Sequence, residues 1–105
     1  MTTPVTVLAP IKIAQGKTES DLLQASERFQ EEFARHQPGI LRRELIRKSE
    51  GEYIDIVQFR SAKDAQDVME KEQESEACHA FFSVMDLSDM NDEDLTPYPS
   101  LATYI

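Results

Sequence analysis

The stretch at 38–60, PGILRRELIRKSEGEYIDIVQFR, constrains the fold more than any other part of the chain. Two runs rich in strand-forming residues, 40–48 and 53–60, flank the polar turn SEGE at 49–52. Gly51 is the residue of this turn that adopts a positive φ most readily, so the stretch predicts an antiparallel β-hairpin. Both arms carry apolar and charged side chains on each of their two faces. Because a sheet with one solvent-exposed face alternates more cleanly, we expect both faces of the hairpin to be covered.

Helix-like segments lie before and after the hairpin. The segment 18–37 opens with the N-cap residue Thr18, an acid follows three positions later, and apolar residues then recur at helical spacing. The segment 61–72 opens with a second N-cap residue, Ser61. Its helical stripe contains Ala65, Val68, Met69 and Glu72. The apolar run 77–85 is typical of a second short helix or of a helix end.

Strand candidates stand near both ends of the chain. The run 5–13 is rich in β-branched residues, and 101–105 predicts a short terminal strand after an acidic loop at 86–99. The order β-α-β-β-α-β predicts a single α+β domain spanning 1–105, with a ferredoxin-like, four-stranded antiparallel sheet and helices on one face. The other face is then bare although its strands are apolar. A second copy of the chain would cover that face, so we expect a homodimer.

Composition excludes several classes of protein. The net charge of −9 argues against binding to nucleic acid and to anionic membrane surfaces. The N-terminus lacks the basic and long apolar regions of a signal peptide, and we expect a soluble, cytoplasmic protein. Cys78 is the single cysteine, so neither an intrachain disulfide nor a structural zinc site is expected. The acidic run 86–94 lacks the spacing of an EF-hand and favours a solvated loop, so we expect no metal.

The chain resembles the dimeric α+β barrel proteins, and among them the antibiotic-biosynthesis-monooxygenase-like domains. The resemblance rests on a Pro-Gly pair before the second strand, a polar turn, and a third strand that ends in an aromatic residue before a capped helix. The matching residues are Pro38, Gly39, Gly51, Phe59 and Ser61. ESEACHAFFSVM at 74–85 is similar to the end of the family's second helix. The resemblance covers residues 5–85 and the terminal strand.

The resemblance implies a homodimer whose two sheets face each other across a barrel lumen. Some members are cofactor-independent oxygenases of aromatic polyketides, and others degrade haem with a histidine, a tryptophan and an asparagine. This chain has no tryptophan, and its only asparagine, Asn91, lies in the acidic segment, so the resemblance to the haem-degrading members fails. It implies cofactor-independent oxidation of a small apolar or aromatic substrate. The alternative is a stress-responsive or small-ligand-binding dimer without catalysis.

Five residues are candidates for a site. His79 is the candidate catalytic residue, because histidine exchanges protons readily near neutral pH, although a histidine at a helix end also occurs simply on the surface. Arg43 and Asp55 lie on adjacent arms of the hairpin and can pair, either inside a pocket or as a salt bridge on an exposed face. Tyr53 and Gln58 are further polar groups that would line a substrate-binding pocket.

Overall fold

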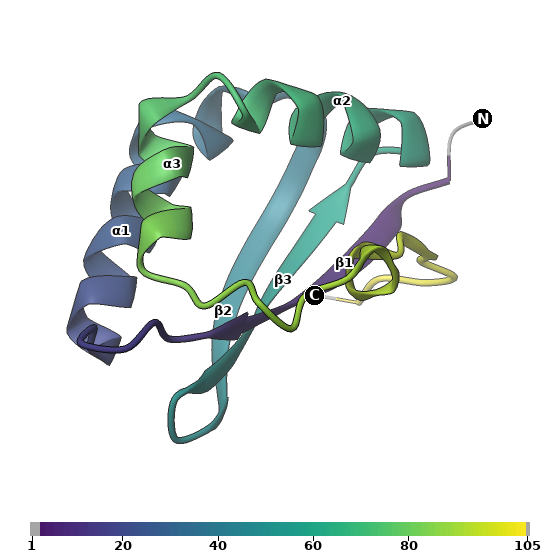
Figure 1. Ribbon diagram of the computed structural model, residues 1–105. Coiled ribbons are helices and arrows are strands. Elements are labelled where there is room, and N and C mark those ends of the chain that lie inside the picture. The colour runs from purple at the N-terminus through teal and green to yellow at the C-terminus, as the bar shows by residue number, and fades with distance from the viewer. Residues whose placement is uncertain (1–2, 105) are drawn as a thin grey trace.

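The computed structural model describes residues 3–104 as one antiparallel sheet with helices packed on it (Figure 1). The strands are β1 (Val5–Lys12), β2 (Ile40–Ser49), β3 (Glu52–Phe59) and β4 (Tyr98–Pro99), in the spatial order β2-β3-β1-β4. The helices are α1 (Glu19–Glu32), α2 (Ala62–Glu72) and α3 (Glu76–Ser83), with 3-10 turns η1 (Ala34–His36) and η2 (Asp92–Leu95). This is the ferredoxin-like α+β fold that the order of elements predicts.

Both expected caps form where the sequence places them. The Thr18 hydroxyl accepts a hydrogen bond from the Asp21 backbone at 3.2 Å, and the Asp21 carboxylate accepts one from the Thr18 backbone at 2.9 Å. The Ser61 hydroxyl accepts from the Asp64 backbone N–H at 3.1 Å and so caps α2. Each cap satisfies an N–H group that has no partner within the helix, which fixes where the helix begins.

Two glycines shape the hairpin and its junctions. Gly51 has a φ of +79° and closes the turn between β2 and β3 as expected. Gly39 is needed for a different reason, because a Cβ at this position would lie 2.8 Å from the Cβ of Asp64 at the start of α2. Its carbonyl accepts a hydrogen bond of 2.8 Å from the Arg60 backbone, which ties the start of β2 to the end of β3.

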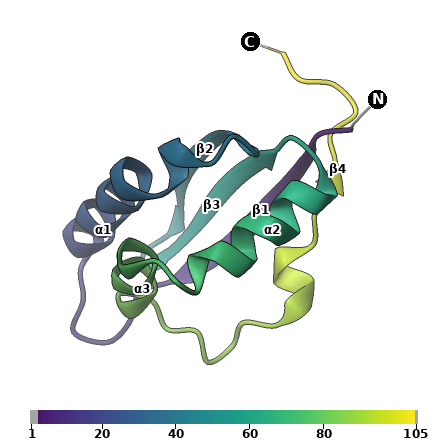
Figure 2. The same ribbon diagram turned by 90° about the horizontal axis from the view of Figure 1, so that it is seen from above.

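The three α-helices cover one face of the sheet, as Figure 2 shows from above. The face they cover carries Val5, Val7 and Ile11 of β1 and Tyr53, Asp55, Val57 and Phe59 of β3. On α1 the buried residues are Leu22, Ser26 and Phe29, one to two turns apart, so the helix lays one stripe on the sheet. The core therefore lies between the sheet and the helices.

The opposite face of the sheet is only partly covered. Ile46 and Ile54 form a cross-strand pair there, Ile56 follows two residues later, and Leu8 keeps 47% of its surface exposed. The C-terminal segment crosses one end of this face, where the Gln58 amide donates hydrogen bonds to the hydroxyls of Ser100 and Thr103 at 3.3 and 3.0 Å.

The terminal strand is displaced from its predicted position. We expected it at 101–105, but β4 is Tyr98–Pro99, which pairs with Thr6 and Val5, and residues 101–104 are not in a strand. Ile105 lies outside the described residues. The pairing is short because Pro97 and Pro99 carry no backbone N–H to donate to the ladder. Within residues 3–104, no helix is both long and apolar enough to span a bilayer.

Candidate functional site

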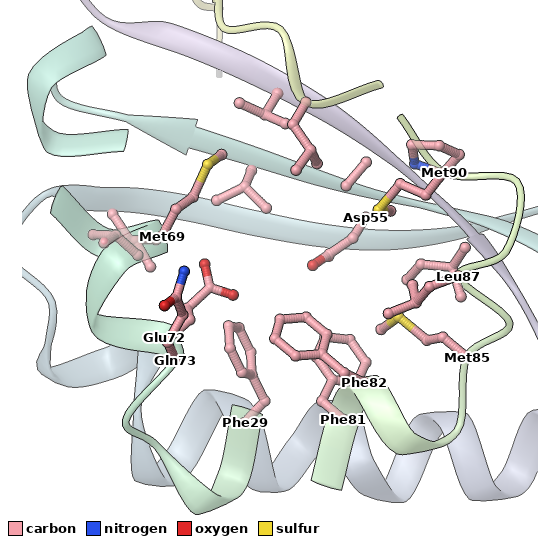
Figure 3. A pocket seen from close by; sticks show the side chains of 18 of the residues that line it. Phe29, Asp55, Met69, Glu72, Gln73, Phe81, Phe82, Met85, Leu87 and Met90 are labelled. Carbon is pink, nitrogen blue, oxygen red and sulfur yellow. The ribbon is translucent and has the colours of Figure 1, made fainter. Parts of the chain in front are cut away.

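A cavity of about 320 Å³ lies between the sheet and its helices (Figure 3). Its wall is built by β1, β2, β3, the three α-helices and the segment that follows α3, which supplies Met85, Leu87, Met90 and Leu95. The size falls at the lower end of the range of small-molecule sites, roughly 300–1,000 Å³. The cavity is therefore formed within one chain, on the face that the helices cover.

Aromatic and thioether side chains make most of the cavity wall. The ring centroids of Phe29 and Phe81 lie 5.0 Å apart at 36°, and Phe82 stacks on Phe81 at 6.3 Å. Met69 from α2 and Met85 after α3 face the same space. Methionine is unbranched and polarisable, so this wall can adapt to apolar molecules of different shape.

A buried ion pair forms one side of the site. The Nη2 of Arg43 lies 3.3 Å from both carboxylate oxygens of Asp55, and the two side chains are only 7% and 8% exposed. Asp55 lines the cavity, and burial raises the pKa of its carboxyl group while the Arg43 charge opposes that rise. The guanidinium carbon of Arg43 also lies 4.7 Å from the centroid of Phe29, a cation–π arrangement.

A second carboxylate, that of Glu72, faces the same space. Glu72 ends α2, and Figure 3 shows it pointing into the cavity across from Asp55. Burial, and then the negative charge of Asp55, raise the pKa of Glu72 to about 7, while Arg43 acts in the opposite direction. Its side chain is mostly buried, and no hydrogen bond to that side chain is present within residues 3–104. The cavity thus holds an acid that changes protonation near neutral pH.

The structure distributes the five predicted site residues over different places. Asp55 lines the cavity and Arg43 pairs with it, inside the protein rather than on an exposed face. Tyr53 shares this face of the sheet, but its hydroxyl donates to Glu19 at 2.9 Å, and it borders a separate hollow beside the acidic segment. Gln58 lies on the opposite face of the sheet, under the C-terminal segment.

His79 lies away from the cavity wall. It is exposed on α3, and its Nε2 is 2.6 Å from the carbonyl oxygen of Gln73, so the ring bridges the α2–α3 junction. Its neighbour Cys78 is fully buried, and burial raises the pKa of that thiol to about 11. The catalytic role of His79 stays a prediction that this geometry does not test.

Sequence reasoning missed Glu72 as a site residue, although a signal for it was present. Glu72 continues the stripe of Ala65 and Val68, which are both buried. A carboxylate in the apolar stripe of a helix is costly to bury, so its presence there was the available clue to a site. The sequence pattern predicts only that the aromatic residues of the wall are buried in the core. Hydrophobic periodicity does not show whether that core is fully packed or contains a cavity.

No arrangement of His, Cys, Asp and Glu side chains within the described residues is suited to hold a metal ion. The two carboxylates of the cavity, with the arginine behind them, can instead bind a polar substituent, accept a proton or release one.

Comparison with known proteins finds solved structures with a similar fold. No family model and no curated protein sequence matches the chain. Among solved structures, a "putative antibiotic biosynthesis monooxygenase" from Caulobacter crescentus CB15 is similar with a TM-score of 0.59 and 19% identity, over 80% of each chain. The protein PA3566 from Pseudomonas aeruginosa is similar with a TM-score of 0.54 and 22% identity, over 97% of this chain and 98% of its own. The chain has an antibiotic-biosynthesis-monooxygenase-like fold.

Proposed function

We propose that the protein oxidises a small apolar or aromatic substrate in the cavity between its sheet and helices, without a cofactor. One observation carries this proposal: two carboxylates, Asp55 and Glu72, converge on a cavity whose wall is mostly apolar, with Gln73 as a further polar residue. A concave apolar site with few polar groups is the usual form of a small-molecule site. The likeness in fold to the Caulobacter protein supports the class of reaction.

The proposed reaction uses molecular oxygen as oxidant and the substrate as reductant. A CH₂ group beside an aromatic ring loses its two hydrogens, one oxygen atom becomes the new carbonyl, and the other leaves as water. A side chain must accept a proton from the substrate early in this sequence. Two residues are candidates for that step: His79, proposed from the sequence, and Glu72, whose pKa of about 7 suits proton transfer near neutral pH.

A second copy of the chain is part of the proposal. Leu8, Ile54 and Ile56 lie on the sheet face that the helices leave uncovered, and Leu101 and Tyr104 beside it are 96% and 90% exposed. Such a surface is apolar enough to pair with itself about a two-fold axis. The proposed assembly is a homodimer that joins the two sheets and leaves the cavity within each chain.

Oxygen uptake tests the reaction. The protein is mixed with a panel of aromatic substrates that carry an activated CH₂ group, and oxygen consumption and product mass are followed. Met69→Trp fills the cavity from α2 and is expected to abolish uptake, because the substrate loses its space. Gln66→Trp, at an exposed position on the same helix, is the matched control and should retain uptake. If Met69→Trp leaves oxygen uptake unchanged, the reaction does not take place in the cavity.

A ligand-binding dimer without catalysis is the second candidate, and the exposed position of His79 favours it. In that case aromatic compounds bind to the wild type and not to Met69→Trp, but no oxygen is consumed. Binding measured beside uptake therefore separates the two functions.

The dimer is tested by light scattering after size-exclusion chromatography. Ile54→Asp places a charge in the middle of the uncovered face and is expected to give a folded monomer, whereas Ile54→Val should retain the dimer. A wild type that is monomeric at every concentration would contradict this part of the proposal.

A further inference from the structure

The charges around the cavity do not balance. Arg43 carries one positive charge, and Asp55 and Glu72 each carry a negative charge when ionised, so the site has one excess negative charge. These three groups belong to one site, because Asp55 and Glu72 line the same cavity and Arg43 lies 3.3 Å from Asp55. A buried charge that lacks a partner is costly in an apolar environment. The excess charge therefore favours a ligand that brings a positive one.

Arg43 is not available to neutralise Glu72. Its Nη1 donates to Gln30 at 3.1 Å, its Nη2 donates to Ser26 at 2.9 Å, and its Nε and Nη2 both reach Asp55. The guanidinium carbon also lies over the rings of Phe29 and Phe81, 4.7 and 5.6 Å from their centroids. Arg43 is thus fixed by Asp55 and by the packing of α1, and the Glu72 carboxylate is left to face the cavity.

The rest of the cavity specifies the body of the ligand. Phe81 and Phe82 present stacked rings, and Met69 and Met85 present flexible thioethers, a wall that accepts a flat apolar group. The segment after α3 adds apolar wall at Leu87 and Met90, and it is part of the acidic run 86–94. Negative charge of the loop and of the whole chain raises the local concentration of cations.

We propose that the ligand of this cavity is an arylalkylamine, an aromatic ring that carries an aliphatic amine, whose ammonium group binds the Glu72 carboxylate while its ring packs against Phe81 and Phe82. The inference rests on the proposed substrate site and names the class of molecule that the site takes. An ammonium supplies the missing charge and up to three hydrogen-bond donors to a carboxylate that accepts no hydrogen bond from residues 3–104. Oxidation of the bound molecule is a separate matter that this inference does not require.

Three matched probes test the inference: phenethylamine, phenethyl alcohol and phenylacetate, which share a phenyl ring and differ in charge. Affinity is measured by isothermal titration calorimetry, and methyl NMR signals of Met69 and Met85 report whether a probe enters the cavity. We expect the amine to bind about tenfold or more tightly than the alcohol, and the anion to bind weakest. Glu72→Gln should remove the preference for the amine, so that the amine and the alcohol bind with similar affinity.

The pH dependence adds an independent measurement. Glu72 faces Asp55 from β3, Arg43 from β2 and the buried Cys78 from α3, and it titrates at about 7. The amine stays protonated well above this value, so its affinity should rise as the pH increases through about 7 in the wild type. That rise should be absent in Glu72→Gln. Glu70→Gln, which removes an exposed carboxylate from the same helix, is the matched control and should behave as the wild type.

The outcomes separate this inference from the proposed function. If the amine and the alcohol bind with equal affinity and both shift the two methionine signals, the proposed preference for an amine is wrong. The cavity then remains a candidate substrate site. A preference for the amine that persists in Glu72→Gln would also overturn it, because another group would then hold the ammonium. If none of the three probes shifts the methionine signals, both the amine ligand and the proposal that the cavity binds small aromatic molecules are wrong.

Discussion

Arg43 and Asp55 form an ion pair between two strands of the hairpin, 3.3 Å apart and almost fully removed from solvent. The two residues are diagonal neighbours, since Arg43 lies opposite Val57 and Asp55 lies opposite Leu45. The pair connects the sheet to α1 through Ser26 and Gln30 and supplies one polar side of the cavity.

Removing one partner of this pair should be strongly destabilising. Arg43→Met leaves the Asp55 carboxylate buried without a counter-charge, and we expect a loss of about 3–5 kcal/mol in the free energy of unfolding. The double variant Arg43→Met/Asp55→Leu should recover most of that loss, because no buried charge remains. Urea unfolding at one protein concentration measures both. Losses that simply add in the double variant would show that the two side chains do not act as a pair.

Glu72 should make the stability of the fold depend on pH. Its pKa is raised from 4.5 to about 7, so the folded chain binds this proton more tightly than the unfolded chain does. The resulting stabilisation is complete below about 4.5 and is lost as the pH rises through about 7. Glu72→Gln removes the penalty of the buried anion and should be more stable than the wild type at alkaline pH by about 1–3 kcal/mol.

Urea unfolding of wild type and Glu72→Gln at both ends of this pH range provides the measurement. The difference between the two proteins should shrink toward zero in acid, where the wild-type side chain is also neutral. A difference that stays constant with pH would mean that Glu72 titrates as it does in the unfolded chain.

His79→Ala distinguishes the two acid–base candidates. The His79 ring is exposed, contacts the backbone carbonyl of Gln73 and does not itself line the cavity, so its removal should leave probe affinity unchanged. The cost in stability should be about 1 kcal/mol, the worth of one exposed hydrogen bond. A large loss of oxygen uptake in this variant, with probe affinity retained, would instead assign the proton transfer to His79.

Cys78 should be chemically inert in the folded protein. The side chain is fully buried, and burial raises the pKa of its thiol from 9.0 to about 11, with a smaller contribution from Glu72. A shift of two pKa units lowers the thiolate fraction near neutral pH by about a hundredfold. Reaction with a coloured disulfide reagent should therefore be at least that much slower in the folded chain than in urea. Equal rates would show that α3 opens readily.

The element order and the helix starts could be predicted from the sequence because their causes are local. Thr18 and Ser61 cap helices through hydrogen bonds to residues three positions later, and Gly51 closes a turn by its own φ. In each case the deciding interaction spans a few residues, so the chain order contains it.

The site depended on which face of the sheet received the helices, and only tertiary packing decided that. Both faces of the hairpin are partly apolar, so alternation alone left the Arg43–Asp55 pair free to be buried or exposed. The stripe of α1 placed the pair inside, and the end of α2 brought Glu72 across the cavity from it. The position of β4 also depends on a strand distant in sequence, because β4 pairs with β1. The packing of helices against the sheet determines how deeply a carboxylate is buried and how close it lies to other charges. These two quantities decide whether the carboxylate is a solvated surface group or part of a site.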